Sequence, residues 1–201
     1  MAIEMGGKNG IIEADQKTLE FLGGRSGKIF RSDNDAAYAD ELEIDVGAIE
    51  PQVALPPAVD NVEPLSAVEG RIIDQAFLGT CTNGRLEDIE VATKIIKGKK
   101  IARNVRLIVS PASEDIYFAA LEKGYLQELV KAGATVCNAS CGPCIGRHEG
   151  VLCEGETCVS SMNRNFTGRM GDPKADIILA SPATVAASAL AGKIADPRDY
   201  L

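Results

Sequence analysis

Cys141 and Cys144 form a C-x-x-C pair, a spacing that lets one loop present two thiolates to the same metal centre. The glycine and proline between them predict a tight loop whose backbone N–H groups can donate hydrogen bonds to sulfur. The pair fits half of a zinc site, an iron–sulfur centre or a redox dithiol, and with Cys81 and His148 it would complete a Cys₃His zinc site. The C-x₂-C-x₂-C run of ferredoxins is absent, which disfavours an electron-transfer cluster. Spacing alone leaves the other chemistries open.

Each segment that carries these cysteines, and one that carries two arginines, follows a predicted strand. The strands are expected at 72–78, 135–137 and 158–161, and they lead into residues 79–84 (GTCTNG), 137–146 (CNASCGPCIG) and 163–169 (NRNFTGR). Ligands bind at the carboxyl ends of strands in open α/β sheets. We therefore expect the lone cysteine, the cysteine pair, Arg164 and Arg169 to converge on one edge of a sheet.

Strands and helices alternate from residue 71 onward. Further strands are predicted at 105–109 and 176–180, and helices at 86–97, at 113–123, before Gly133 and after Ser181-Pro182. In the first of these helices Ile89, Ala92 and Ile96 share one face. This alternation predicts a doubly wound, mainly parallel sheet.

The first 70 residues have a different character. Residues 32–70 contain ten acidic side chains, no Lys or Arg, and four of the nine prolines, so the segment carries a charge of −10 and the remainder +2. It is predicted to be an acidic, mostly extended connector, with one half-buried strand at 41–46 where charged and apolar residues alternate. A short helix is expected at 15–22, ended by two glycines.

The composition bounds the class of protein. With 201 residues, 45% hydrophobic, 25% charged and a net charge of −8, the chain has the length and composition of a soluble globular protein of one or two domains. The acidic balance argues against nucleic-acid binding. Six cysteines are too few for a disulfide scaffold. The longest uncharged apolar run, 177–192, is too short to span a membrane and no signal peptide is evident, so we expect a cytoplasmic location without a membrane partner.

Together, the segments 79–84, 141–146 and 163–169, in this order, resemble the aconitase superfamily, and the closing run SPATVAASA (181–189) does too. The context GRHEGV (146–151) is most similar to the large subunits of 3-isopropylmalate dehydratase and homoaconitase, particularly the archaeal type. The resemblance covers essentially the whole chain. It implies a three-layer α/β/α iron–sulfur domain with a mainly parallel sheet from residue 71 onward. Residues 1–70 would be the tail of a preceding α/β domain followed by the linker.

The resemblance implies a [4Fe-4S] cluster held by Cys81, Cys141 and Cys144. Three thiolates would leave one iron without a protein ligand, open to a substrate carboxylate and hydroxyl. It also implies that Asn163, Arg164 and Arg169 contact the cluster and the substrate. Arginine suits that role because its planar fork matches a carboxylate, although surface or interdomain ion pairs remain the alternative role for both arginines.

The other cysteines, Cys137, Cys153 and Cys158, are predicted to have structural roles. His148 is expected to be a hydrogen-bonding neighbour of the cluster loop, and no titratable partner is evident for it. A phosphate loop at 23–28 is rejected because the spacing and the residue after the lysine are wrong.

The resemblance implies a hydro-lyase that isomerises 2-isopropylmalate in leucine biosynthesis, with homoaconitate or methylmalate derivatives as rival substrates. Family members are longer and carry histidine–carboxylate pairs in preceding domains, so the chain is interpreted as the C-terminal half of a large subunit with no catalytic base of its own. Its expected partners are the N-terminal half and a small subunit with a swivelling domain. A non-enzymatic zinc-binding module is the alternative from another class.

Overall fold

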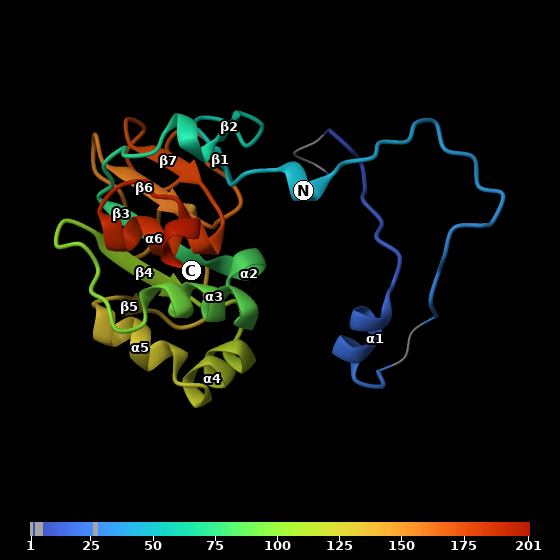
Figure 1. Ribbon diagram of the computed structural model, residues 1–201, viewed down its shortest axis with the longest axis horizontal. Coiled ribbons are helices and arrows are strands. Elements are labelled where there is room, and N and C mark those ends of the chain that lie inside the picture. Colours follow the sequence, from blue (N-terminus) through green and yellow to red (C-terminus); the bar gives the residue numbers. More distant parts are fainter. Residues whose placement is uncertain (1, 3–5, 26–27) are drawn as a thin grey trace. The chain divides into compact units, whose positions relative to one another are not determined.

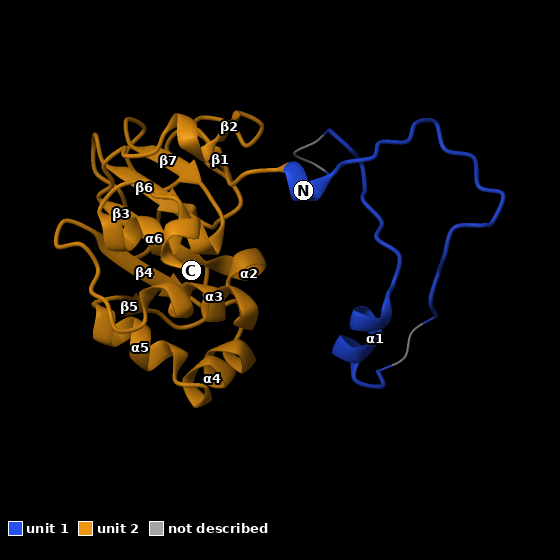
Figure 2. Ribbon diagram, in the orientation of Figure 1, with its two compact units in different colours: residues 1–48 blue, residues 49–201 orange. Residues whose placement is uncertain are grey.

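The computed structural model (Figure 1) describes residues 2, 6–25 and 28–201. The chain forms two compact units, Met1–Ala48 and Ile49–Leu201. Figure 2 distinguishes the two units by colour. Each unit is described by itself below. No helix in these described ranges is long and apolar enough to cross a membrane.

The described residues of the first unit form one α-helix, α1 (Gln16–Leu22), as predicted. The Asp15 carboxylate begins it by accepting a hydrogen bond from the Thr18 N–H at 2.8 Å, and Gly23 ends it in a left-handed conformation with φ 57°. The strand predicted at 41–46 is wrong: residues 41–45 have no regular structure, and the 3₁₀-helix η1 (Val46–Ala48) follows. The described part of this unit contains no strand with which that segment could form ladder hydrogen bonds.

The second unit is built on a seven-stranded sheet with the strand order β2-β1-β7-β6-β3-β4-β5. The strands are β1 (Gln52–Ala54), β2 (Val62–Pro64), β3 (Gln75–Gly79), β4 (Arg106–Ser110), β5 (Thr135–Val136), β6 (Thr157–Ser160) and β7 (Asp176–Leu179). Strands β3 to β7 are all parallel, and β1 joins β7 in antiparallel orientation. The predicted mixed α/β class with a mainly parallel sheet is confirmed.

The helices of this unit begin and end at the signals in the sequence. They are α2 (Thr80–Asn83), α3 (Leu86–Ile96), α4 (Glu114–Glu122), α5 (Tyr125–Ala132) and α6 (Pro182–Ala191), with the 3₁₀-helices η2 (Leu65–Ala67), η3 (Gly142–Ile145) and η4 (Pro197–Tyr200). The Ser113 hydroxyl caps α4 by accepting from the Ile116 N–H at 3.3 Å. Ser181 caps α6 in the same way, with proline at the first helical position.

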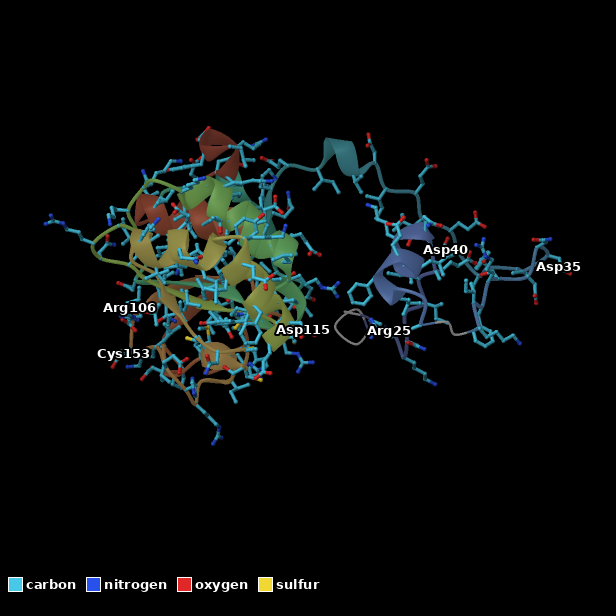
Figure 3. The ribbon with its side chains drawn as sticks, turned by 90° about the horizontal axis from the view of Figure 1, so that it is seen from below. Arg25, Asp35, Asp40, Arg106, Asp115 and Cys153 are labelled. Carbon is cyan, nitrogen blue, oxygen red and sulfur yellow. The ribbon has the colours of Figure 1, made fainter. Side chains whose placement is uncertain are left out.

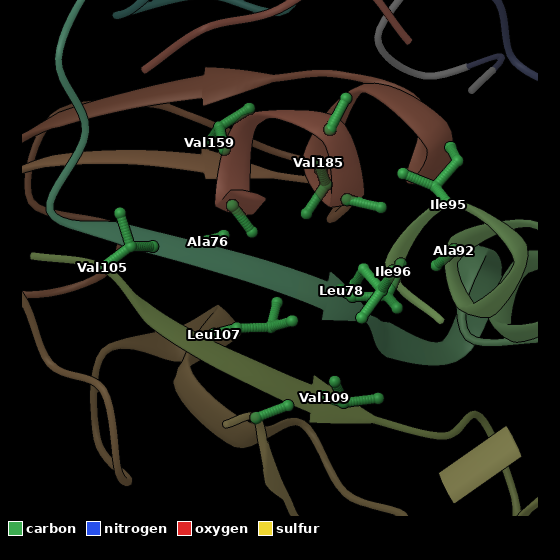
Figure 4. Packing of buried hydrophobic residues seen from close by; sticks show 14 of the residues in the cluster. Ala76, Leu78, Ala92, Ile95, Ile96, Val105, Leu107, Val109, Val159 and Val185 are labelled. Carbon is green, nitrogen blue, oxygen red and sulfur yellow. The ribbon is translucent and has the colours of Figure 1, made fainter. Parts of the chain in front are cut away.

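One face of the sheet carries the larger core, between the strands and the four longer helices. Ala76 and Leu78 of β3, with Leu107 of β4, pack toward Ile96 of α3 and Val185 of α6 (Figure 4). Alternate residues of the same strands face the other side, because side chains of a strand point to opposite faces in turn.

The other face carries a smaller core of Phe77, Ile108, Cys158 and Ile177, packed against Cys144, Leu152, Met162 and Met170. The covering residues belong to the segments 137–156 and 161–175, which contain η3 and no α-helix. On this face of unit 2, loops therefore take the place of the second helical layer that we expected. Glycine-rich turns explain this, since Gly142, Gly146, Gly150, Gly155, Gly168 and Gly171 all adopt positive φ.

The sheet also includes part of the segment that we expected to be a linker. Val53 of β1 and Leu65 of η2 are buried, and Ala54 pairs with Leu179 at the edge of the parallel strands. The structure thus divides the chain between residues 48 and 49, whereas we placed the division between 70 and 71. A three-residue strand among acidic residues and prolines has too short an apolar pattern to be evident without its partner strand.

Candidate metal centre and substrate loop

Three loops leave the carboxyl ends of β3, β5 and β6 and contact one another or the neighbouring strand β4. The Asn83 side-chain amide donates to the Ser161 carbonyl oxygen at 2.6 Å, which joins the first loop to the third. The Ser110 hydroxyl at the end of β4 donates to the Ser140 carbonyl oxygen at 2.9 Å, which fixes the second loop.

The first loop turns sharply to present Cys81 on α2. Gly79 has φ 135°, and a Cβ there would lie 2.0 Å from the Ser110 carbonyl oxygen, so only glycine permits this approach of β3 to β4. Thr80 follows with φ 84° and is the one non-glycine residue with positive φ among those described. This strained turn leaves Cys81 exposed at the sheet edge.

The second loop presents the cysteine pair on η3. Gly142 adopts φ 49° and its N–H donates to the Ser140 hydroxyl at 3.1 Å, while the Cys144 N–H donates to the Cys141 carbonyl oxygen at 3.0 Å. Cys141 is exposed, whereas Cys144 is only 8% exposed. Cys81, Cys141 and Cys144 are all free of disulfide bonds.

The third loop brings nitrogen donors to two of these sulfurs. The Asn163 Nδ2 lies 3.8 Å from the Cys81 Sγ, and its Oδ1 accepts a short hydrogen bond from the Thr82 hydroxyl. The Arg169 Nη2 lies 3.6 Å from the Cys144 Sγ. Donors aimed at sulfur stabilise the thiolate form and tune an iron–sulfur centre.

Arg169 is held by more than this contact. Its guanidinium carbon lies 5.3 Å from the centroid of the Phe166 ring, and its Nε is buried with no hydrogen-bond partner among the described residues. Arg164 is exposed. Sequence reasoning did not single out Asn165 or Phe166, although both belong to the same motif. Asn165 is buried, and its amide donates to the carbonyl oxygens of Ala54 at 3.2 Å and Ala58 at 3.4 Å.

The remaining cysteines differ from these three either in the burial of their thiols or in their place in the sheet. Burial raises the pKa of the Cys158 thiol to about 12, and burial also raises the pKa of the Cys137 thiol. Cys153 precedes β6, at the end of the sheet opposite to the three loops. Its N–H donates to Glu156, which pairs with Arg106 at the start of β4, and Figure 3 shows Arg106 and Cys153 close together.

His148 has a titratable neighbour that the sequence did not reveal. Its Nδ1 is in short contact with the Glu149 carboxylate, and the His148 side chain is largely exposed. Adjacent residues in a strand or helix point apart, so this contact depends on the irregular backbone that follows η3.

The donor types at this sheet edge fit an iron–sulfur centre, in which each thiolate binds a different iron. Among the described residues, no group of three His, Cys, Asp or Glu side chains is placed to hold one metal ion. Cys81, Cys141 and Cys144 are free thiols, and nitrogen donors lie near the sulfurs of Cys81 and Cys144, which are ligand and donor types that an iron–sulfur centre uses.

The chain is similar in sequence to proteins of one known family. A model of the aconitase family (aconitate hydratase) matches residues 1–72 and 62–192. The chain is 53% identical to 3-isopropylmalate dehydratase large subunit 2 of Archaeoglobus fulgidus, over 100% of this chain and 49% of that protein. It is 56% identical to the probable methanogen homoaconitase large subunit of Methanosarcina mazei, over 98% of this chain and 51% of that protein. The chain spans about half the length of the curated relatives it matches.

Proposed function

The chain belongs to the aconitase family, and on this premise we propose that it is the cluster-carrying part of a hydro-lyase that converts 2-isopropylmalate to 3-isopropylmalate. The observation that carries the proposal is the pair of nitrogen–sulfur contacts, Asn163 to Cys81 and Arg169 to Cys144. They connect a loop rich in carboxylate-binding groups to the sulfurs that would hold a metal centre. A dicarboxylic substrate and a cluster would then occupy one site.

Cys81, Cys141 and Cys144 would hold a [4Fe-4S] cluster. Such a cluster, when bound by three thiolates, supplies an iron without a protein ligand that acts as a Lewis acid toward a hydroxyl group. The free, partly exposed state of Cys81 and Cys141 leaves their sulfurs accessible for assembly, and the tight η3 turn orients Cys144.

Arg164 and Arg169 would bind the substrate carboxylates. Asn163 would orient these carboxylates relative to Cys81. A guanidinium forms two parallel hydrogen bonds to a carboxylate, which fixes direction as well as position. The buried Nε of Arg169 retains an N–H group without an acceptor among the described residues, which suits a group that takes a ligand oxygen. Positioning of this kind raises the rate because it removes rotational freedom before reaction.

The rest of the reaction would require groups outside these 201 residues. Dehydration needs a base at the carbon next to a carboxylate and an acid for the departing hydroxide, and we assign these roles to a small subunit and to the portion that corresponds to the other half of the relatives' length. The exposure of Ile11, Ile12, Phe21 and Phe30 in the first unit supports a covering polypeptide. We place the assembled enzyme in the cytoplasm and in leucine biosynthesis.

Homoaconitate or a methylmalate derivative is the alternative substrate. The relative at 56% identity is named a homoaconitase large subunit, so sequence identity alone does not separate these substrates. A zinc-binding module without catalytic activity is the alternative from another class, and the zinc analysis described below tests it.

Anaerobic reconstitution of the chain followed by iron, sulfide and zinc analysis tests the proposal. We expect about four irons and four sulfides per chain, with absorbance near 400 nm. Stoichiometric zinc without sulfide would contradict it. Assays of the assembled enzyme with isopropylmalate and with homologous substrates then decide between the substrate alternatives.

A further inference from the structure

We propose that Phe166 is a positioning residue. Its ring packs against the Arg169 guanidinium and holds the Arg169 Nη2 near the Cys144 sulfur. This inference deepens the proposed function and rests on it for the identity of the bound group. The contact between the ring and the guanidinium is a property of the chain alone, so it can be tested with or without a cluster.

A tight turn places the two side chains beside each other. The Arg169 N–H donates to the Phe166 carbonyl oxygen at 3.0 Å, which closes a four-residue turn, and Gly168 at its third position has φ 76°. Only glycine adopts that conformation without strain. Because the turn also fixes the backbone of Arg169 against Gly146, where a Cβ would meet the Arg169 carbonyl oxygen at 2.8 Å, the remaining freedom lies in the long arginine side chain.

The exposure of Phe166 indicates a use for its ring other than core packing. Phe77, in the core beneath the same loops, is 0% exposed, whereas Phe166 is 47% exposed. A ring that stays half in solvent forgoes part of the free energy of burial. The guanidinium stacked on its face compensates through the attraction between a cation and the π-electrons.

The Phe166 ring, the Cys144 sulfur and the turn at residues 166–169 together determine the orientation of the Arg169 guanidinium. An arginine side chain without such a platform samples several rotamers, and ordering it costs conformational entropy at the moment of binding. With the ring on one side and the Cys144 Sγ 3.6 Å from Nη2, that ordering is present before ligand arrives. Phe118 is the matched comparison, since it is 60% exposed on α4 and its aromatic neighbour is Tyr117.

Side-chain NMR of the full chain, without a cluster, tests the contact. The δ-protons of Arg169 should be shifted upfield by the ring current in the unaltered chain, in Phe166→Tyr and in the control Phe118→Leu. In Phe166→Leu the upfield shift should be lost, and the Arg169 Nε–H should exchange with solvent about tenfold faster because ordering of the side chain is lost. Arg169 signals that are unchanged in Phe166→Leu would overturn the proposal.

The midpoint potential of the cluster in the reconstituted chain tests whether Phe166 acts on the cluster through Arg169. Loss of an N–H donor to sulfur makes a cluster harder to reduce. Phe166→Leu and Arg169→Gln should both shift the potential to more negative values, and the double variant should shift it no further than Arg169→Gln alone. Additive shifts would mean that Phe166 does not act through Arg169. If the unaltered chain takes up no cluster, the proposed function fails, while the NMR result still decides the positioning role.

Discussion

The six cysteines of the chain lie in very different surroundings, and these surroundings determine which of the thiols can bind iron. Cys81 and Cys141 are exposed at loops, and Cys144 lies under an arginine nitrogen. Cys158 is enclosed in the smaller core, where burial raises its pKa. A thiolate is needed to bind iron, so the burial and raised pKa of Cys158 argue against this residue as a ligand.

We expect Cys81→Ser, Cys141→Ser or Cys144→Ser to abolish cluster binding, because a hydroxyl is a poor ligand for iron in such a centre. Absorbance near 400 nm and sulfide content after anaerobic reconstitution measure the loss. Cys153→Ser is the control, since Cys153 is exposed at the opposite end of the sheet. Loss of the cluster in that control, with the fold intact, would show that the ligands are assigned incorrectly.

Arg164→Lys and Arg169→Lys should retain the cluster but raise the KM of the assembled enzyme about ten- to hundredfold, because lysine keeps the charge and loses the two-point contact with a carboxylate. Steady-state kinetics with the full set of subunits gives the measurement. Kinetics equal to those of the unaltered enzyme would contradict substrate binding by these arginines and favour the alternative, in which both form surface or interdomain ion pairs.

The Cys158 thiol should make the stability of the chain depend on alkaline pH. Its pKa is about 12 in the folded chain and near its ordinary value of 9.0 when unfolded, because burial disfavours the thiolate. Between these pH values the unfolded state binds fewer protons, so the free energy of unfolding is at its full value below about pH 9 and falls as pH rises toward 12. Urea unfolding at about pH 8 and pH 10 should show a smaller decrease for Cys158→Ala than for the unaltered chain.

At the scale of elements, the site depends on how closely β3 and β4 approach. The turn from β3 into α2 lies against the last residue of β4, and the loop after β6 lies against the β1–β2 hairpin through Asn165. The four longer helices pack on the opposite face of the sheet, and the segments that contain the cysteine pair and Arg169 cover the loop face.

Gly79→Ala should therefore lower the free energy of unfolding by more than about 3 kcal/mol, since the added Cβ meets the Ser110 carbonyl oxygen. Gly98→Ala is the control, because Gly98 also has positive φ but has no atom near the new Cβ, and its cost should be about 1 kcal/mol. Denaturant unfolding compares the two. Equal costs would show that the approach of the strands is less rigid than this geometry indicates.

At the scale of the whole molecule, the two units differ in how well they bury their apolar side chains. Ile12 of the first unit is 97% exposed, whereas the second unit has an extensive core. The first unit is thus expected to depend on a covering polypeptide. The proposed reaction also requires acid and base groups that we assign to other polypeptides.

The reconstituted chain by itself should therefore show no turnover of isopropylmalate, followed through the ultraviolet absorbance of the unsaturated intermediate. Activity should appear only when a polypeptide corresponding to the other half of the relatives and a small subunit are added together. Either addition alone serves as the control. Steady turnover by the chain alone would place the base within these residues and contradict the division of roles.

Much of this follows from the sequence because it depends on neighbours along the chain. The helix at Gln16–Leu22, the caps at Ser113 and Ser181 and the strands of the parallel sheet correspond to local patterns of apolar, capping and glycine residues. The family resemblance likewise rests on short motifs, and the family comparison confirms it.

Only the tertiary structure established features that join distant parts of the chain. The β1 strand needs β7 as its partner, the predicted strand at 41–46 found none in the described part of its unit, and loops cover the second face of the sheet where helices were expected. The nitrogen donors on Cys81 and Cys144 come from residues 82 and 25 positions away along the chain, a spacing that carries no sign of contact. Local patterns specify backbone conformation, whereas contacts between loops depend on how strands are ordered in the sheet.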